Sequence, residues 1–256
     1  MEGGPRAAFV HARPMHMYSD LAPWFHLLTH PADYAEEAEF AVRVVEETIL
    51  GEARTLLELG SGGGNTASHL KRRFECTLTD LSRDMLEVSR TINPECEHLV
   101  GDMRTLRLGR TFDVVFAHDA LSYLTTEGDL GAAIETAAAH VRPGGVVLLV
   151  PDATTEMFVP GTDTGGHDGE EGRSLRFLEW THAPGPGATS YVVDFAIVVR
   201  APDGATRVVH DVHELGLFPE TTWLRLLREA GLEPLELPVE NPFAAEQATF
   251  LARRPA

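Results

Sequence analysis

The spacing of hydrophobic residues predicts strands that alternate with helices over residues 55–150. Five apolar runs have the length of buried strands: 55–59, 76–79, 96–100, 112–117 and 146–150. Helical patterns lie between several of them, at 65–74, 82–90 and 129–140. Strands connected by helices of this length form βαβ units, so we expect a parallel sheet covered on both faces.

The pattern continues differently towards both ends of the chain. A helical pattern follows Pro31, and residues 1–17 look like a loose lead-in. A last helix is predicted over 220–230, and the last strand candidates are 232–237 and 249–252.

The alternation of strands and helices breaks after Pro151. A glycine-rich stretch, 153–174, is predicted to be a loop. Three strand-like runs follow it, at 175–182, 190–200 and 206–217. Because these runs mix apolar and polar residues, we expect an antiparallel insertion with one face open to water or to a partner.

Composition and charge narrow the function classes. The chain has 256 residues, of which 43% are hydrophobic, and a formal net charge of −18. Such a surface repels phosphate backbones and anionic lipids, so we expect neither nucleic acid nor a membrane as a partner. The two cysteines, Cys76 and Cys96, form no CxxC pair, and residues 1–10 contain no signal-peptide pattern. These features favour a cytoplasmic protein.

A cluster of glycines joins the first predicted strand to the following helix. Four of the five residues from Gly60 to Gly64 are glycine. Glycine allows a ligand to approach the backbone closely, and a helix N-terminus offers free N–H groups. We therefore expect a nucleotide-type ligand here, because a flexible turn alone is a weaker explanation of the pattern.

The motif and its spacing resemble those of the class I S-adenosylmethionine-dependent methyltransferases. The first motif of that family, acid-x-Gly-x-Gly-x-Gly, matches at Glu58, Gly60, Gly62 and Gly64. The match covers roughly 52–150 and 218–254, about half of the chain. With its insertion, the sequence is most similar to bacterial small-molecule enzymes such as the sugar N-methyltransferases.

This resemblance implies a fold and a division of the chain. The fold is α/β, a doubly wound (Rossmann-like), mostly parallel seven-stranded sheet with an antiparallel insertion after the fifth strand. Residues 1–50 would form a helical cap over the donor site. Residues 51–152 and 218–256 would form the methyltransferase core, and 153–217 would be a lid or a dimer surface.

The resemblance also implies a donor site for S-adenosylmethionine, with S-adenosylhomocysteine as its product. Asp80 would accept hydrogen bonds from the ribose hydroxyls, and Asp102 would receive the adenine amino group beside the backbone of Met103. The complete set of donor-site candidates is Tyr18, Glu58, Gly60, Ser61, Gly62, Asn65, Asp80, Leu81, Met85, Asp102, Met103 and His118. We expect no metal.

The acceptor should lie where the fourth strand ends, at Ala117-His118-Asp119. His118 could be a general base that Asp119 orients, or Asp119 could act itself. The alternative is that His118 only packs beside the donor. Tyr18 and Tyr34 are candidates for a second wall, although they could equally pack the N-terminal helix onto the core.

One further group of polar residues could suggest a metal site. His210, Asp211, His213 and Glu214 lie together on the last strand of the insertion. Residues three apart on a strand face opposite sides, so His210 and His213 cannot converge on one ion. We interpret the whole group as strand-surface residues.

These expectations together predict methyl transfer to a nitrogen or oxygen of a small molecule. The reaction is an in-line displacement, and it needs alignment and exclusion of water more than a base. Two alternatives remain: a non-catalytic protein that binds S-adenosylmethionine, and a nicotinamide-dependent reductase. The sequence does not identify the acceptor, and a homodimer through the insertion is possible.

Overall fold

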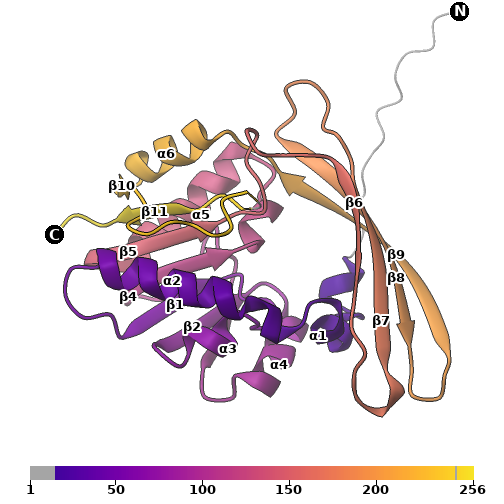
Figure 1. Ribbon diagram of the computed structural model, residues 1–256. Coiled ribbons are helices and arrows are strands. Elements are labelled where there is room, and N and C mark those ends of the chain that lie inside the picture. The colour runs from indigo at the N-terminus through magenta and orange to yellow at the C-terminus, as the bar shows by residue number, and fades with distance from the viewer. Residues whose placement is uncertain (1–14, 246) are drawn as a thin grey trace, which may run out of the picture.

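The computed structural model describes residues 15–245 and 247–256. Two sheets organise this part of the chain, one of seven strands and one of four (Figure 1). Most of the lead-in expected over residues 1–17 lies outside the described residues. No helix within the described ranges is long and apolar enough to cross a membrane.

The larger sheet has the strand order β10-β11-β5-β4-β1-β2-β3. Its strands are β1 (Thr55–Leu59), β2 (Glu75–Asp80), β3 (Glu97–Val100), β4 (Phe112–His118), β5 (Val141–Val150), β10 (Glu233–Leu235) and β11 (Phe250–Arg253). Only β11 runs against its neighbours, β5 and β10, so the mostly parallel seven-stranded sheet is confirmed. The strand order reverses between β1 and β4, and open α/β sheets bind ligands at this switch point.

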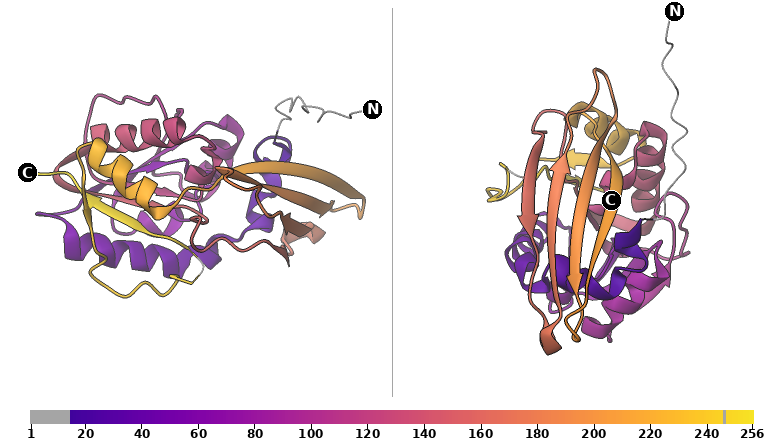
Figure 2. Two further views of the ribbon diagram at one scale, coloured as in Figure 1. Left: turned by 90° about the horizontal axis from the view of Figure 1, so that it is seen from above. Right: turned by 90° about the vertical axis from the view of Figure 1, so that its right-hand side faces the viewer.

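Helices cover both faces of the larger sheet (Figures 1 and 2). On one face lie α2 (Ala35–Thr48) and α3 (Ala67–Leu70), and on the other lie α5 (Glu127–His140) and α6 (Glu220–Glu229). The helix α4 (Arg83–Ile92) packs beside β2 and β3. This is the doubly wound arrangement that the alternation of strands and helices predicted.

The central strands are apolar because both of their faces are buried. On β1, Leu57 and Leu59 join the core beneath α5 and α6, whereas Leu56 joins the core beneath α2. The same alternation continues along β4 and β5. Glu58, which is buried among these strands, is therefore an ionisable residue in an apolar environment and needs a functional explanation.

Two elements differ from the predicted boundaries. The regular helix α3 is much shorter than the expected 65–74, although the amide of Phe74 still bonds to the carbonyl of Leu70 at 3.0 Å in the turn that follows. Strand β5 begins at Val141, before the predicted turn at Pro143–Gly145. That turn forms a bulge within the strand, because the register with β4 shifts there.

The insertion forms the four-stranded antiparallel sheet, in the order β6-β7-β8-β9. Its strands are β6 (Gly161–Gly165), β7 (Ser174–Thr181), β8 (Ser190–Arg200) and β9 (Thr206–Gly216). The antiparallel insertion is thus confirmed, but the prediction of a loop over 153–174 missed β6. Its sequence, Gly-Thr-Asp-Thr-Gly, has no apolar alternation, and the backbone ladder to β7 holds it at the sheet edge.

The four-stranded sheet has one packed face and one exposed face. Its packed face carries Tyr191 and Val193 against the core, and Ile197 against the N-terminal segment. On the opposite face, Trp180 and Val208 are exposed. The sheet stands at one side of the core (Figure 2).

Residues 15–34, which we call the N-terminal segment, lie between the core and the four-stranded sheet (Figure 1). They form η1 (His16–Tyr18), η2 (Ala22–Trp24), α1 (Phe25–Leu28) and η3 (Pro31–Tyr34). The two ends of the insertion meet where it joins the core. There the amide of Thr155 donates to the carbonyl of Phe218 at 3.2 Å.

Candidate active site

The glycine turn lies at the carboxyl end of β1, at the switch point of the sheet. Gly60, Gly62 and Gly64 all have positive φ angles, of 72°, 51° and 75°. Side chains other than glycine rarely adopt this conformation, so the alternate glycines of the motif correspond to three left-handed positions. The turn curls back on β2, where the amide of Ser61 donates to the carbonyl of Thr79.

Gly60 also provides space for two neighbouring segments. A Cβ atom at this position would lie 2.3 Å from the Cβ of Ala120 and 2.9 Å from the Cε of Met103. Met85 is fully buried beneath the same turn, with its Cε 3.8 Å from where a Cβ of Gly62 would lie. The candidates Met85 and Met103 therefore both contact the glycine turn.

Asp80 ends β2 and holds the turn through its carboxylate. One oxygen accepts a hydrogen bond from the amide of Gly62 at 2.8 Å, and the other accepts one from the amide of Ser82 at 2.7 Å. Burial raises the pKa of Asp80, while these amides oppose that shift. Each carboxylate oxygen can accept a second bond, so two acceptor positions remain for hydroxyl groups.

Three buried polar atoms around the turn lack a hydrogen-bond partner among the described residues: Glu58 Oε2, Ser61 Oγ and Asn65 Oδ1. Burial raises the pKa of Glu58 to about 8, although nearby His118 lowers it. Leaving such groups unsatisfied is costly, and they are the acceptors that an ammonium group or a hydroxyl group requires. The chemistry of these residues therefore fits S-adenosylmethionine, which carries both groups.

The other end of the expected donor site is only partly open. Leu81, which follows Asp80, is 70% exposed and offers an apolar surface to a planar ring. Asp102 is engaged by Arg104, whose Nε lies 3.0 Å and whose Nη2 lies 2.6 Å from its carboxylate oxygens. This guanidinium lowers the pKa of Asp102. Arg104 is thus a neighbour of the expected adenine position that the sequence analysis did not single out.

The N-terminal segment closes over the glycine turn. The Nε2 of His26 lies 3.0 Å from the carbonyl oxygen of Gly63, and a Cβ at Gly63 would meet the ring of Phe25 at 2.5 Å. Tyr18 is held next to Asp80, because Ser82 Oγ donates to its carbonyl oxygen at 2.6 Å. The segment thus contacts the glycine turn of the expected donor site directly, and the contact by His26 was not predicted.

His118 lies at the end of β4 and is almost completely buried. Its Nε2 is 3.1 Å from Glu37 Oε2 on α2, and its Nδ1 is 3.2 Å from Asp119 Oδ2. The amide nitrogen of Gln247 lies 3.1 Å from the same Nε2. Burial alone lowers the pKa of His118, but Asp119 and Glu37 outweigh burial and raise it to about 9.

Asp119 and Asp152 bring two carboxyl groups together beside His118. Asp119 has a φ angle of 55°, unusual for a residue other than glycine, and such backbone strain is often found at functional sites. Burial and the neighbouring Asp119 raise the pKa of Asp152 well above its usual range. We call Glu37, His118, Asp119, Asp152 and Gln247 the acceptor cluster.

A chain of hydrogen bonds connects the core to the four-stranded sheet. The hydroxyl oxygens of Tyr18 and Tyr123 are 2.6 Å apart, and the Tyr123 hydroxyl is 2.8 Å from His213 Nδ1. His213 Nε2 lies 3.2 Å from Asp211 Oδ2, which accepts a bond from the amide of Met17. Tyr123 is on η4 (Ala120–Tyr123), directly after β4.

This chain corrects one interpretation of the sequence. Asp211 and His213 are buried on the packed face of β9, whereas His210 and Glu214 are exposed as strand-surface residues. Residues 211 and 213 share a face because strand side chains alternate. The sequence analysis recognised that His210 and His213 face opposite sides, but not that one side is packed.

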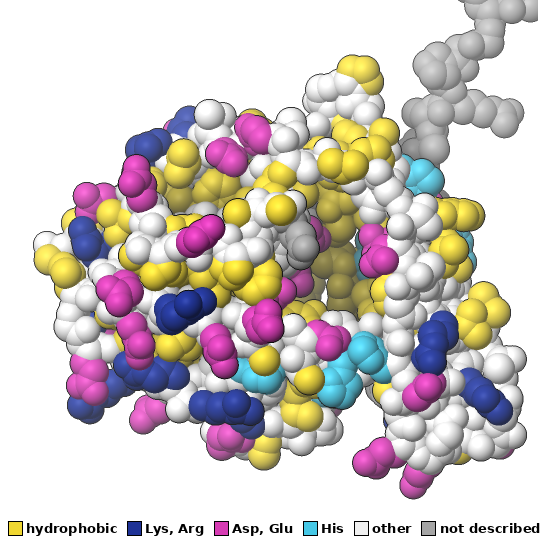
Figure 3. Space-filling model, in the orientation of Figure 1, with side chains coloured by type: hydrophobic (Ala, Val, Ile, Leu, Met, Phe, Trp, Pro, Cys, Tyr) yellow, Lys and Arg dark blue, Asp and Glu magenta, His cyan; other side chains and the backbone are white. Residues whose placement is uncertain are grey.

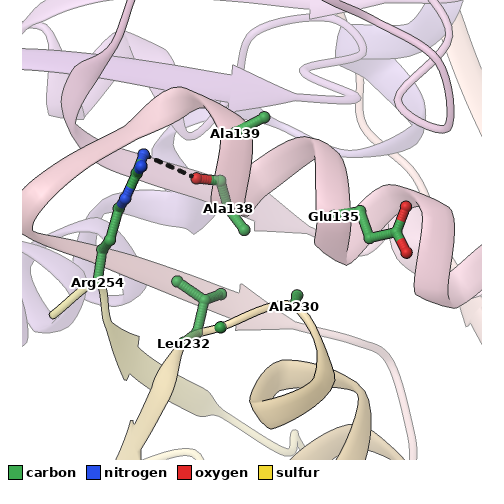
Figure 4. A pocket seen from close by; sticks show the side chains of 7 residues that line it. Glu135, Ala138, Ala139, Ala230, Leu232 and Arg254 are labelled. Atoms are coloured by element: carbon green, nitrogen blue, oxygen red, sulfur yellow. Dashed lines mark hydrogen bonds between the residues drawn. The ribbon is translucent and has the colours of Figure 1, made fainter.

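The space-filling view shows a recess between the core and the four-stranded sheet (Figure 3). A separate pocket of about 360 Å³ lies between α5 and the turn after α6 (Figure 4). Arg254 lines this pocket and donates to the carbonyl of Ala138 at 3.3 Å. Its neighbour Arg253 pairs with Val146 near the start of β5, so this pocket lies away from the carboxyl strand ends that carry the glycine turn.

The doubly wound sheet, the glycine turn at its switch point and the acid that ends β2 define a methyltransferase of class I. A model of the methyltransferase domain matches residues 56–145. A dTDP-3-amino-3,4,6-trideoxy-α-D-glucopyranose N,N-dimethyltransferase from Streptomyces venezuelae is 34% identical, over 78% of this chain and 84% of that protein. A related dTDP-3-amino-3,6-dideoxy-α-D-glucopyranose N,N-dimethyltransferase from Streptomyces fradiae is 32% identical, over 78% of each chain.

Solved structures agree with these sequence relatives. The crystal structure of DesVI from Streptomyces venezuelae superimposes with a TM-score of 0.80 at 29% identity, over 93% of this chain and 99% of that one. A sugar N-methyltransferase from Streptoalloteichus gives the same TM-score at 28% identity, over 100% and 99%. The chain belongs to the S-adenosylmethionine-dependent methyltransferases, in the group of the bacterial sugar N-methyltransferases. The predicted family, enzyme class and donor are confirmed, and the alternatives of a reductase or a non-catalytic protein are not favoured.

Proposed function

We propose that this enzyme transfers a methyl group from S-adenosylmethionine to the amino nitrogen of an amino sugar. The observation that carries the proposal is the position of the acceptor cluster. His118 and Asp119 end the strand next to β1, so carboxyl groups lie beside the glycine turn that would hold the donor. Carboxylates favour a cationic amine over a neutral hydroxyl group. The three amino-sugar N,N-dimethyltransferases among the relatives support this acceptor class.

On the donor side, we assign binding to residues around the glycine turn. Asp80 would accept the ribose hydroxyls, and Glu58, Ser61 and Asn65 would hold the polar groups of the amino-acid portion. Leu81, Met85 and Met103 would pack against the base, and Tyr18 would close the site from the N-terminal segment. The donor's sulfonium supplies an activated methyl group when bound. The protein's contribution is alignment and exclusion of water.

On the acceptor side, an ammonium group must lose one proton before its nitrogen can attack. Burial and the neighbouring Asp119 raise the pKa of Asp152, which favours the protonated form of that carboxyl group. We assign to Asp119 the acceptance of that proton: the acceptor's N–H bond breaks and an O–H bond forms on the pair. A second methylation would repeat the same transfer.

His118 enters this scheme with a role different from the expected one. With a pKa of about 9 it is protonated at neutral pH and cannot serve as a general base there. We assign to it the positioning of Asp119 and Glu37, whose charges it partly neutralises. The neighbouring Asp119 accounts for part of this shift, but Glu37, on α2, also raises the pKa of His118, and the motif at 117–119 does not reveal that contribution.

The test is a comparison of Asp119→Asn with the parent enzyme on an amino sugar and on the matching sugar in which a hydroxyl replaces the amine. We expect the parent to methylate only the amine. In the variant we expect turnover to fall about 100-fold, as for loss of a proton-transfer group, with unchanged S-adenosylmethionine affinity in calorimetry. Methylation of the hydroxyl analogue at a similar rate would contradict the proposed acceptor.

We also propose the division of labour among the three parts of the chain. Of the cap expected over 1–50, the described residues 15–50 cover the donor, 51–152 and 218–256 form the catalytic core, and 153–217 provide a wall of the acceptor site. The contact between His26 and Gly63 supports the first assignment, and the bond between Tyr123 and His213 supports the last.

A homodimer through the exposed face of the four-stranded sheet completes the proposal. Trp180, Val192, Val198 and Val208 give this face apolar area that a second copy would cover. Light scattering should find a dimer that Trp180→Glu dissociates. We place the enzyme in the cytoplasm, consistent with its free thiols, and expect its acidic surface to avoid nucleic acids and anionic lipids.

A further inference from the structure

Two polar residues of the four-stranded sheet are buried as deeply as its apolar core. Asp211 is 3% exposed and His213 is 1% exposed, on the packed face of β9 that Val209 and Leu215 also line. The imidazole of His213 lies against the ring of Phe195, with 5.0 Å between the ring centroids. Burying a carboxyl group and an imidazole among such neighbours costs free energy that apolar residues would not cost. The two residues therefore need an explanation beyond the packing of the sheet.

The neutral ring of His213 carries its proton on Nε2. Burial alone raises the pKa of Asp211, but the His213 ring and the amide of Met17 outweigh burial and lower it, so Asp211 is a carboxylate. Its Oδ2 lies 3.2 Å from Nε2 of His213, without the alignment of a hydrogen bond. This carboxylate would repel a lone pair on Nε2, whereas it attracts an N–H group. The ring therefore presents a bare Nδ1 to Tyr123.

The direction of the remaining hydrogen bonds follows from this tautomer. The hydroxyl of Tyr123 donates to Nδ1 of His213, at 2.8 Å, because Nδ1 has no proton to give. Tyr123 then has no proton left for Tyr18, so the hydroxyl of Tyr18 donates to the oxygen of Tyr123, at 2.6 Å. Every proton of the chain points towards Asp211. The Tyr18 oxygen is left with free lone pairs, and within residues 15–245 and 247–256 it has no other hydrogen-bond partner.

The tyrosine end of the chain lies beside the expected donor site. Tyr18 is fixed at the end of β2, because Ser82 Oγ donates to its carbonyl oxygen, and Tyr123 follows the end of β4. Strand β1, which carries the glycine turn, lies between β2 and β4 in the sheet. The two hydroxyl groups therefore connect the strand ends on either side of the turn. Tyr18 is partly exposed there, whereas the other end of the chain is buried, so a ligand reaches the chain at its tyrosines.

We propose that Asp211 and His213 are positioning residues for methyl transfer: through Tyr123 they hold the Tyr18 oxygen as a hydrogen-bond acceptor for an N–H of the acceptor amine. In the proposed function, Asp119 accepts the proton that leaves the nitrogen. The Tyr18 oxygen holds a second N–H, and the two bonds together restrict the direction of the nitrogen lone pair. This inference rests on the proposed function, since it takes an amine as the acceptor and adds what orients that amine.

The bond to Tyr18 matters most in the second of two successive methylations. A primary amine that has given up one ammonium proton retains two N–H bonds, and either of them can point to Tyr18. After the first methylation the amine retains only one. If the chain lost its direction, the Tyr18 hydroxyl could donate to the nitrogen lone pair instead of accepting an N–H bond. We therefore expect loss of the chain to slow the second transfer more than the first.

The first experiment measures the ratio of monomethylated to dimethylated product in Tyr18→Phe and Tyr123→Phe. The probe is dTDP-3-amino-3,6-dideoxy-α-D-glucopyranose, the sugar in the name of one relative, and products are counted by mass spectrometry. We expect the ratio to rise about five- to tenfold in both variants, as for loss of one hydrogen bond, with unchanged affinity for S-adenosylhomocysteine in calorimetry.

The possible outcomes separate the inference from the proposed function. A parental ratio in either variant would overturn the inference, and so would a parent enzyme that stops at one methyl group, while both results leave the proposed function intact. A parent enzyme that binds S-adenosylmethionine but methylates no amino sugar would overturn the proposed function and this inference together.

Variants of His213 test the buried end of the chain. His213→Asn keeps an oxygen that can accept from Tyr123 and an amide group that can face Asp211, so we expect the product ratio to stay within about twofold of the parent. His213→Leu removes the acceptor, and we expect the same rise as in Tyr123→Phe. His210→Leu, on the exposed face of the same strand, is the matched control and should keep the parental ratio. Equal ratios in His213→Asn and His213→Leu would overturn the inference, because a merely structural role does not depend on a hydrogen-bond acceptor.

The tautomer of His213 is observable without any assay of activity. Nitrogen-15 NMR distinguishes protonated from bare ring nitrogens, and the signals lost in His213→Asn identify those of His213. We expect the proton on Nε2 at neutral pH. A proton on Nδ1 would reverse the direction of the chain and overturn the inference.

Discussion

The two halves of the active site are built in different ways. The proposed donor side consists largely of one continuous stretch, Gly60–Gly64, supported by an acid at the end of the next strand. The acceptor cluster is assembled from four separate segments, with Glu37 on α2, His118 and Asp119 at the end of β4, Asp152 after β5, and Gln247 before β11. Backbone conformation defines the first half, and side-chain charge defines the second. A local motif can therefore predict the donor, but not the acceptor.

The largest effect on this comparison is expected from Gly60→Ala. The new Cβ would lie 2.3 Å from Ala120, at a residue with φ of 72°. The turn must shift, and we expect calorimetry to detect no binding of S-adenosylhomocysteine, a loss of more than about 4 kcal/mol. Gly109→Ala is the control, since Gly109 has a similar φ of 69° but no neighbour within 4 Å. Parental affinity in Gly60→Ala would show that backbone geometry does not define the donor side.

Asp80→Ala tests a donor-side residue that acts through its side chain. It removes the acceptors proposed for two ribose hydroxyls, and we expect donor affinity to fall by about 2–3 kcal/mol. The exposed Asp84, on the same side of the protein at the start of α4, provides the control Asp84→Asn. Unchanged affinity in Asp80→Ala would move the ribose site elsewhere.

The acceptor side can instead be tested by the pH dependence of the free energy of unfolding. His118 has a folded-state pKa of about 9, against an ordinary value of 6.5, so its ionic contribution to stability is fully present below about pH 6.5. That contribution is lost as the pH rises towards and through 9. We expect the destabilisation caused by His118→Gln to be larger at pH 6 than at pH 9.5, by on the order of 2 kcal/mol in urea unfolding. A difference that does not depend on pH would mean that His118 is not held as a cation.

The smallest effect is expected where the acceptor side meets the four-stranded sheet. Tyr123→Phe keeps the ring but removes the hydroxyl that joins Tyr18 to His213. We expect a loss of about 1 kcal/mol in the free energy of unfolding. Tyr191→Phe is the control, because that hydroxyl makes no side-chain hydrogen bond within the described ranges. Equal effects of the two substitutions would show that the connecting chain adds nothing to stability.

The same contrast explains how far the sequence could predict this molecule. Apolar runs and glycines are local signals, so the strands of the core and the turn at Gly60–Gly64 agree with expectation. Strand β6 was not predicted because only its backbone pairing with β7 holds it in the sheet. His213 was misjudged because the sequence of β9 does not show which of its two faces packs against the rest of the protein.

The acceptor cluster shows most clearly what a local sequence pattern cannot predict. Nothing near Glu37 in the sequence distinguishes it from the other acids of α2, yet it is the one that reaches His118. In the sequence, Asp152 follows an apolar strand and resembles a simple turn residue. Only the structure shows that Asp119 lies beside it. Besides the adjacent Asp119, the distant residues Glu37 and Asp152 raise the pKa of His118, and no local pattern in the sequence indicates these two contributions.

The point where the insertion joins the core has a consequence for how such enzymes can be modified. The two ends of the insertion are joined by the hydrogen bond between Thr155 and Phe218, so residues 156–217 leave the core and return to it at the same place. Such a module can be exchanged between relatives with only two junctions, and the glycine turn stays untouched. The exchange must include the N-terminal segment, because Met17 is bonded to Asp211 and Tyr18 reaches His213 through Tyr123. The wall that we propose for the acceptor site is thus exchangeable as two segments, the N-terminal segment and residues 156–217.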